Sequence, residues 1–179
     1  MESSPTFTGP SIASPPEFQW YAVKVRTGAE IRIASHLTHK KIEIFTPTCI
    51  EPRRYSDRIK NVEVALFPGY VFARFDPDLR VPLITTPGVD SIVSTAGVPT
   101  PIDRSEMEAI LRAINGGLPA EPWPYLKTGD KVRINFGSFI GLEGILINAR
   151  GKDRLILSVN MLQRSISVEI PRAWVRPTA

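Results

Sequence analysis

Residues 66–77 read Leu-Phe-Pro-Gly-Tyr-Val-Phe-Ala-Arg-Phe-Asp-Pro, and the organisation of the chain is best followed from them. Pro68-Gly69 predicts a turn, and Asp76-Pro77 predicts a stop, because proline lacks an N–H and restricts the residue before it. The residues between them alternate with a period of two, which predicts a strand. One face of this strand carries Tyr70, Phe72 and Arg74, and the other carries Val71, Ala73 and Phe75.

The two faces of this strand differ in composition. The face with Val71 is apolar and is predicted to belong to the core. The other face combines two aromatic rings with an arginine, which is unusual for a surface that meets only water. Either a helix covers this face, or Phe67, Tyr70 and Phe72 help to line an apolar pocket for a partner, because aromatic side chains dominate such contacts.

Length and charge set the outer limits of the interpretation. The chain has 179 residues, enough for one medium domain or two small ones, and its 42% hydrophobic content allows a packed core. From Lys127 onward there are 9 lysines and arginines against 4 aspartates and glutamates, whereas the preceding residues are nearly balanced. The excess favours a polyanionic partner for the C-terminal third; the alternative is an ordinary solvated surface.

The sequence carries no sign of export. Cys49 is the only cysteine, so no intramolecular disulfide can form and nothing indicates secretion. No run approaches the roughly 18 apolar residues of a membrane span. The N-terminus lacks the basic and apolar segments of a signal peptide. We therefore expect a soluble cytoplasmic protein.

The first half of the chain predicts two strands around a helix. Residues 1–17 are rich in Ser, Pro and Thr and are expected to form a disordered leader. Residues 18–25 alternate as in a strand, with Trp20 opposite Tyr21. Residues 27–30 (Thr-Gly-Ala-Glu) have the form of a capping box and open a helix that should end near Lys41. Residues 42–50 predict the second strand.

Residues 53–60 form a basic patch around Tyr55. The patch could track phosphates while the tyrosine stacks on a base. The alternative is a solvated hairpin tip. The candidate nucleic-acid-binding residues here are Arg53, Arg54, Arg58 and Lys60.

The second half begins with a short helix or extended turn at 79–86 and a strand at 91–95. Asp103 is predicted to cap another helix, with Glu106 at its third position and Ile102 stapled to Met107. The Asn-Gly-Gly of residues 115–117 should end it. Residues 117–126 are rich in proline and predict a linker and domain boundary.

Beyond the linker the pattern changes to short strands. They are predicted at 131–134, 144–147, 155–159 and 165–170, with a fifth at 174–176. Turns at intervals of about ten residues are typical of a small barrel. A module of roughly 50 residues is near the minimum for an independent core, so we expect marginal stability.

No constellation of residues supports catalysis. His36 and His39 lie three apart with no further ligand at metal-site spacing, which favours a helix surface. Cys49 has no evident activating base, which favours a buried structural thiol. Glu106 and Glu108 are two apart on a helix and point in different directions. No nucleotide-binding or nucleophile motif is present. We therefore predict no catalytic, cofactor-binding or metal-binding residues.

Several motifs, in their order, resemble a NusG-family transcription factor. They are Trp20-Tyr21, Phe-Pro-Gly-Tyr-Val-Phe at 67–72, Thr-Pro-Gly-Val at 86–89 and Gly-Asp-Lys-Val-Arg at 129–133. Residues 137–144 also resemble the opening of a KOW module, in which the glycines serve tight turns and bulges. The resemblance spans about residues 18–176.

The resemblance implies an α/β (α+β) fold in two domains. An NGN domain at 18–116, with an antiparallel sheet flanked by helices, would be linked through 117–126 to an SH3-like KOW β-barrel at 127–179. It further implies that the NGN domain binds the RNA polymerase clamp through an apolar pocket and tunes pausing, which favours the pocket over the covering helix. Carried over by position, the pocket residues are Trp20, Tyr21, Phe67, Pro68, Tyr70 and Phe72.

The resemblance also implies a contact with non-template DNA near Thr85 and Thr86. A threonine before Pro-Gly is equally good turn chemistry. The segment 79–82, Leu-Arg-Val-Pro, does not match the threonine-rich run that some specialised members use against the polymerase gate loop.

The tip of the barrel departs from the family pattern. Housekeeping members carry an Ile-Phe-Gly-Arg-like tip whose ring meets the termination factor Rho or a ribosomal protein. Here the tip lacks the ring, which resembles specialised paralogues that antiterminate selected operons. The candidate partner-binding residues of the tip are Met161, Leu162, Gln163 and Arg164.

The partner of the barrel is left open by the sequence. Arg150, Lys152 and Arg154 around one turn, with Arg164, make RNA a candidate, and a ribosomal protein is the alternative. The expected protein is a monomer with no membrane partner. The alternative functions are a housekeeping factor that couples polymerase to Rho or the ribosome, and a ribosome- or RNA-associated KOW protein.

Overall fold

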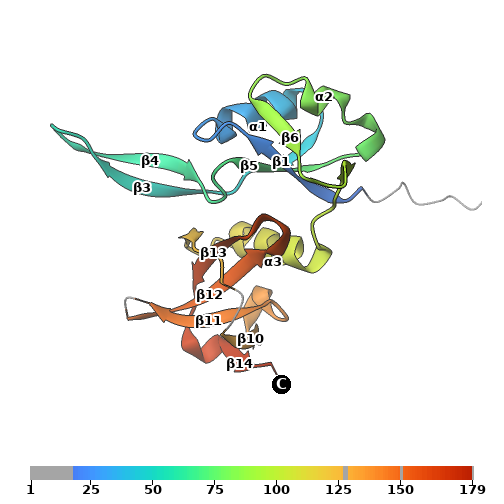
Figure 1. The fold of residues 1–179 in the computed structure, drawn as a ribbon. Coiled ribbons are helices and arrows are strands. Elements are labelled where there is room, and N and C mark those ends of the chain that lie inside the picture. The colour runs from blue at the N-terminus through green and yellow to red at the C-terminus, as the bar shows by residue number, and fades with distance from the viewer. Residues whose placement is uncertain (1–17, 127–128, 150, 179) are drawn as a thin grey trace, which may run out of the picture.

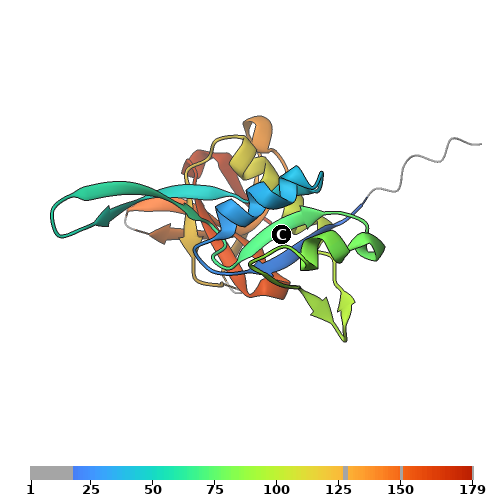
Figure 2. The same ribbon diagram turned by 90° about the horizontal axis from the view of Figure 1, so that it is seen from above.

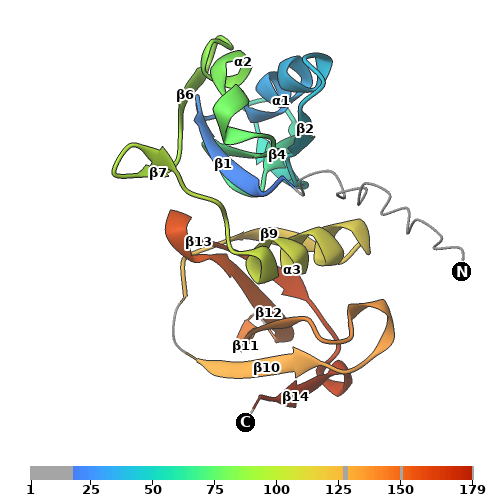
Figure 3. The ribbon, with the colours of Figure 1, turned by 90° about the vertical axis from the view of Figure 1, so that its right-hand side faces the viewer.

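The computed structural model describes residues 18–126, 129–149 and 151–178. It contains two larger antiparallel sheets with helix α3 (Arg104–Asn115) between them, and two further sheets of two strands each (Figures 1 and 3). The leader predicted at 1–17 lies outside the described residues.

The first sheet is built around the strand predicted from residues 70–75. Its order is β2-β5-β1-β6, with β1 at Trp20–Val25, β2 at Glu43–Phe45, β5 at Tyr70–Arg74 and β6 at Val89–Ile92. Strand β5 lies between β2 and β1 and pairs antiparallel with both, and Ala22 is opposite Phe72. The predicted period-two strand is confirmed.

Helices cover one face of this sheet. They are α1 (Glu30–His39), α2 (Val81–Ile84) and the single turn η1 (Pro77–Leu79). Ile33 and Leu37 of α1 pack with Leu83 against Val23 and Val71, all essentially inaccessible to solvent. The prediction that the face with Val71, Ala73 and Phe75 belongs to the core is confirmed.

The capping box predicted at 27–30 is wrong. Ala29 is the N-cap of α1, and no side chain caps the helix. The buried Glu30 carboxylate instead accepts the backbone N–H of Gly69 at 2.7 Å. Gly69 has the left-handed φ of +84° that this turn requires. Its N–H precedes β5, so it needs a partner outside the strand ladder. This hydrogen bond ties α1 to the start of β5.

The strand predicted at 42–50 is two strands. Pro47 separates β2 from β3 (Thr48–Arg54), and β3 pairs only with β4 (Ile59–Ala65) in a sheet of its own. The resulting hairpin, called here the β3–β4 arm, projects far from the body of the molecule (Figures 1 and 2). Its ladder runs from Thr48↔Ala65 to Arg54↔Ile59, so residues 55–58 form the tip.

Helix α3 follows the small hairpin of β7 (Ser94–Thr95) and β8 (Val98–Pro99). The Asp103 carboxylate accepts the backbone N–H groups of Ser105 and Glu106, so the predicted cap is confirmed. The strand predicted at 91–95 is divided between β6 and β7.

The second sheet confirms all five strands predicted beyond the linker. They are β10 (Asp130–Ile134), β11 (Glu143–Ala149), β12 (Lys152–Val159), β13 (Arg164–Glu169) and β14 (Val175–Pro177). Single helical turns lie at η2 (Gly137–Phe139), η3 (Asn160–Leu162) and η4 (Arg172–Trp174). The sheet is strongly curved, as in a small barrel (Figure 3), and is called the barrel below.

The segment predicted as a proline-rich linker contains a sixth barrel strand. Strand β9 (Ala120–Trp123) pairs antiparallel with β13 in the sheet order β14-β10-β11-β12-β13-β9. Pro122 is tolerated because β9 is an edge strand. The strand is fixed by Glu121, whose carboxylate pairs with the buried Arg154, and by the Trp123 ring, which lies 5.8 Å from that guanidinium.

Helix α3 joins the two sheets. Its buried residues Met107, Ile110 and Ala113 belong to one apolar cluster that includes Phe72 of the first sheet and Leu155 of the barrel. Arg112 donates two hydrogen bonds of 2.8 Å to the carbonyls of Ser138 and Ile140. At Gly116 a Cβ would lie 2.3 Å from the Phe139 ring, so only glycine allows this close approach.

Candidate partner-binding site

The face of β5 that carries Tyr70 and Phe72 holds an aromatic cluster. Phe72 packs edge-on against Phe67 at a centroid distance of 5.0 Å and stacks with Phe45 at 6.2 Å. Phe45 in turn meets Trp20 of β1 edge-on at 6.3 Å. Four neighbouring segments therefore contribute to one aromatic face, and we use this name for the residues Trp20, Phe45, Phe67, Tyr70 and Phe72.

Only part of the aromatic face is accessible. Phe67 and Phe72 are 1% and 0% exposed, so they form its floor, whereas Trp20 and Tyr70 are half-buried and Pro68 is exposed. The floor belongs to the same apolar cluster as α3, so a helix covers the Phe72 part of this face, which is the alternative to a pocket that the strand pattern left open. A partner on this surface would therefore touch Trp20 and Tyr70 rather than Phe72.

A cation borders the aromatic face. The Arg74 guanidinium lies 5.7 Å from the centre of the Trp20 ring and pairs with the Glu43 carboxylate at 2.7 Å. The arginine thus holds Trp20 in place at the edge of the cluster.

Tyr21 does not belong to this face. Its side chain is on the opposite side of β1, where its ring lies 5.0 Å from Phe75 within the core beneath α1. Burial, with the nearby Asp76 carboxylate, raises the pKa of the Tyr21 hydroxyl. The assignment of Tyr21 to the pocket is therefore corrected. The alternation of residues 18–25 already placed it opposite Trp20.

Phe45 is the member of the aromatic face that sequence reasoning missed. Its register opposite Phe72 brings it there. The strand pattern at 42–50 was visible, but nothing in it identified the neighbour of β2.

The β3–β4 arm brings the predicted basic residues together. Arg53 is directly opposite Lys60, so these two cations share one face, whereas Arg54 is opposite Ile59 on the other. Asp57 lies 3.9 Å from Arg58, and both side chains are about 70% exposed, a pair of little energetic weight. Tyr55 and Ile59 are 48% and 70% exposed. The outer part of the arm, residues 53–60, therefore offers four cations and an aromatic ring against one acid, Asp57.

Thr86 is placed differently from the expectation. Its side chain is buried, and its hydroxyl donates to the carbonyl of Pro82 at 2.8 Å and accepts from Lys40 Nζ at 2.7 Å. With both hydrogen-bonding functions used, Thr86 is corrected from a DNA contact to a structural residue. Thr85 is exposed, its hydroxyl donates to the Val81 carbonyl, and its role in DNA binding stays a prediction.

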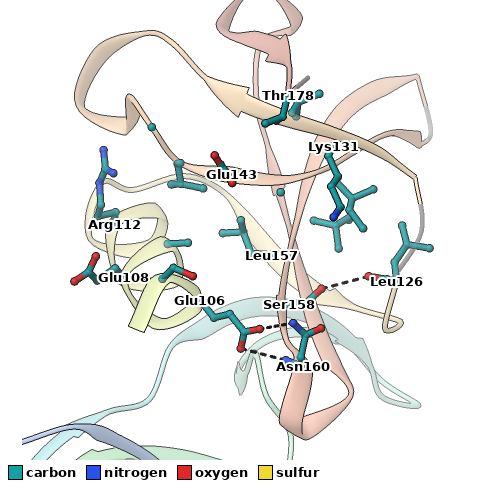
Figure 4. A pocket seen from close by; sticks show the side chains of 18 of the residues that line it. Glu106, Glu108, Arg112, Leu126, Lys131, Glu143, Leu157, Ser158, Asn160 and Thr178 are labelled. Carbon is teal, nitrogen blue, oxygen red and sulfur yellow. Dashed lines mark hydrogen bonds between the residues drawn. The ribbon is translucent and has the colours of Figure 1, made fainter. Parts of the chain in front are cut away.

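The predicted barrel tip lies against α3. Leu162 is 8% exposed and part of the shared apolar cluster, and Gln163 has the left-handed φ of +51°. Beside the tip, Glu106 of α3 accepts hydrogen bonds from the backbone and the side-chain amide of Asn160 (Figure 4). Burial raises the pKa of the Glu106 carboxyl, while these hydrogen bonds act in the opposite direction. Glu106 thus contacts the barrel instead of completing a capping box.

The basic turn predicted in the barrel is largely neutralised. Arg154 is 8% exposed and bonds Glu121 and the Ser167 hydroxyl, and Lys152 pairs with Glu169 at 2.7 Å. Arg150 lies outside the described residues. Arg154 is therefore removed from the cations that were predicted to favour RNA, whereas the roles of the exposed Lys152 and Arg164 stay a prediction.

A cleft of about 1010 Å³ is lined by residues of α3 and of the barrel (Figure 4). Glu106, Glu108 and Arg112 line it from the helix, and Lys131 and Glu143 line it from the barrel. Charges of both signs are spread around this cleft, so they define no pocket for one charged ligand.

No metal-binding cluster is found among the residues that the structure describes. No three His, Cys, Asp or Glu side chains in those ranges converge on a possible metal position. His36 and His39 are exposed on α1, as predicted. Cys49 is half-buried, and burial raises the pKa of its thiol above the ordinary value. None of the described helices is long and apolar enough to cross a membrane.

Comparisons with known proteins identify relatives of this chain. Residues 18–111 match the family model described as NusG, transcription termination factor. The NusG transcription termination/antitermination protein of Deinococcus radiodurans is 29% identical over 175 residues, covering 79% of this chain and 90% of that protein. Its Helicobacter pylori counterpart is 28% identical over 170 residues, covering 87% of this chain and 96% of that protein.

A solved structure shares the fold. The structure titled "Domain interaction in Thermotoga maritima NusG" aligns with 90% of this chain and 97% of its own, with a TM-score of 0.53 and 23% identity. The family model alone covers more than half of the chain, including the aromatic face and the β3–β4 arm. This chain therefore belongs to the NusG family of transcription termination and antitermination proteins.

Proposed function

We propose that this protein is a cytoplasmic elongation factor that binds the clamp of RNA polymerase through the aromatic face. The observation that carries the proposal is the cluster itself, in which Trp20 and Tyr70 stand half-exposed above a floor of buried rings. Large aromatic side chains at the centre of an interface contribute most of its binding free energy. The family membership supports a transcriptional partner for it.

Binding to a purified clamp fragment tests this proposal. Tyr70→Ala removes an accessible ring and should weaken binding about thirtyfold, which corresponds to about 2 kcal/mol. Tyr55→Ala is the matched control, because it removes an exposed tyrosine of the arm. Phe72 is left intact, because truncating a fully buried ring costs about 3–5 kcal/mol of stability. Clamp binding by a folded Tyr70→Ala variant at the parent's affinity would exclude the aromatic face.

Nucleic acid near the polymerase is the proposed ligand of the β3–β4 arm. Its reach from the body and its exposed cations suit contact with DNA phosphates while the aromatic face holds the enzyme. The arm and the aromatic face together would let one molecule touch polymerase and DNA. Tuning of pausing and termination would follow from that bridge.

Within the family we propose an operon-specific antiterminator rather than the housekeeping factor. Leu162 at the barrel tip supplies no ring for Rho or a ribosomal protein, and it is 8% exposed in contact with the α3 cluster. The second candidate is a housekeeping factor coupling polymerase to Rho or the ribosome. Quantitative pull-downs with polymerase, Rho and ribosomal subunits separate the two. Strong binding to Rho would favour the housekeeping function.

A further inference from the structure

An exposed aromatic stack lies on the barrel, outside the surfaces assigned above. The rings of Phe136 and Trp174 have centroids 5.4 Å apart and an interplanar angle of 26°. Trp174 also stacks with Phe139 at 6.1 Å, and Phe139 is buried against Gly116 of α3. The inner ring therefore fixes the stack, while Phe136 keeps 57% of its surface exposed.

Arginines flank this stack in the sequence and in the neighbouring strand. Arg172 and Arg176 lie two residues before and after Trp174, and Arg176 is opposite Arg133 in the β14–β10 ladder. Arg133 is paired with Glu143, and Arg172 lies 4.0 Å from Asp153. Across the described ranges, no carboxylate lies within 4.0 Å of Arg176.

A polar side chain orients the Arg176 guanidinium. In the amide orientation that satisfies both of its polar atoms, Asn135 accepts from Arg176 Nε at 3.1 Å and donates to the Trp174 carbonyl at 2.6 Å. One side chain thus links the Arg176 guanidinium to the backbone of Trp174, while the remaining N–H groups of the guanidinium stay available. Strands β10 and β14 lie on the far side of the barrel from the first sheet and away from the β3–β4 arm (Figures 1 and 3).

The chemistry of this surface selects its partner. A ring with one open face next to cations matches a base and the phosphates beside it, because every base has a π-face. The centre of a protein interface is depleted of charge, which this surface is not. We propose that the Phe136–Trp174 stack binds single-stranded nucleic acid, with a base on Phe136 and adjacent phosphates at Arg176 and Arg172.

The test uses the full chain with Arg54→Glu and Arg58→Glu in the arm, so that the arm contributes little. Fluorescence anisotropy with labelled 12-nucleotide oligo(rU) and oligo(dT) measures the dissociation constants. Phe136→Ala should weaken binding about tenfold. Arg176→Gln should lower the salt slope by about 0.7. Leu79→Ala and Arg32→Gln, at exposed positions in the helices that cover the first sheet, serve as matched controls.

Tryptophan fluorescence adds a readout that a merely structural role would not change. A base on Phe136 lies one ring away from Trp174 and should change the emission of that indole, and Trp174→Phe should remove this change while Trp20 and Trp123 remain. Tighter binding of oligo(rU) would identify RNA as the ligand, and equal binding would identify stacking that ignores the sugar. Absence of binding by the arm-reversed parent at 50 mM salt, or an unchanged affinity and slope in Phe136→Ala and Arg176→Gln, would overturn the proposal.

Discussion

The β3–β4 arm and the turn between β11 and β12 both gather cations in the sequence, yet their surroundings in the folded chain differ. On the arm, Arg53 and Lys60 lie side by side on a two-stranded ribbon that no other sheet covers. On the barrel, Arg154 is buried beneath β9 and paired with Glu121, and Lys152 is paired with Glu169.

The difference comes from what tertiary structure brings to each cation. Glu121 is 33 residues before Arg154 in the chain and reaches it only because β9 adds to the barrel edge. The arm has no such neighbour and keeps its charge toward solvent. Local charge counts therefore predict a binding surface only where the fold supplies no partner of opposite sign.

The largest effect, on the free energy of unfolding, is expected when the ion pair of the buried Arg154 with Glu121 is broken. Arg154→Ala leaves Glu121 without its cation and removes the stacking on Trp123, so the free energy of unfolding should fall by about 3 kcal/mol. Urea denaturation followed by tryptophan fluorescence measures the loss. Arg164→Ala, at an exposed barrel position, should stay within about 0.5 kcal/mol of the parent. Equal stability of these two variants would mean that the Arg154 pair does not hold β9.

A smaller effect, on binding rather than stability, is expected on the arm. Arg54→Glu with Arg58→Glu should weaken binding to a DNA duplex about tenfold at low salt and reduce the salt slope, because fewer counterions are released. The unfolding free energy should change by no more than about 0.5 kcal/mol, since both side chains are exposed. The same double reversal at Arg26 and Arg32, exposed cations beside and within helix α1, controls for net charge. If both pairs weaken binding equally, only net charge matters.

Much of the fold was predictable from local pattern. The Asp103 cap, the strand at β5 and the five barrel strands follow from turn residues and period-two alternation, which act within a few residues. Pairings between distant segments were not predictable in the same way. Strand β9 has three prolines in its neighbourhood and no alternation, and it is ordered by its pairing with β13 and by the contacts of Glu121 and Trp123 with Arg154, all distant in the sequence.

The candidate site shows the same division. Tyr70 and Phe72 were identified from one strand pattern and Trp20 from the family resemblance, and the structure brings them together. Phe45 depends on which strand becomes the neighbour of β5, and Thr86 depends on Lys40 reaching across from the end of α1. Both facts require the folded chain.

The smallest expected effect is a pH-dependent change in stability at Glu106. Glu106 and Glu121 both contact the barrel from outside its five predicted strands, but their surroundings differ. Glu121 has a cation, whereas Glu106 meets only the amide donors of Asn160, and burial raises the pKa of its carboxyl. An acid whose pKa is raised by folding binds more protons in the folded state, so its contribution to stability increases as pH falls through the raised pKa. Glu106→Gln stays neutral, so its stability relative to the parent should decline over that same interval. Urea denaturation of both proteins between about pH 7 and pH 4 measures this. The change in unfolding free energy should be well below that caused by Arg154→Ala. If the stability difference between Glu106→Gln and the parent does not vary with pH, folding does not raise the pKa of Glu106, and the prediction is wrong.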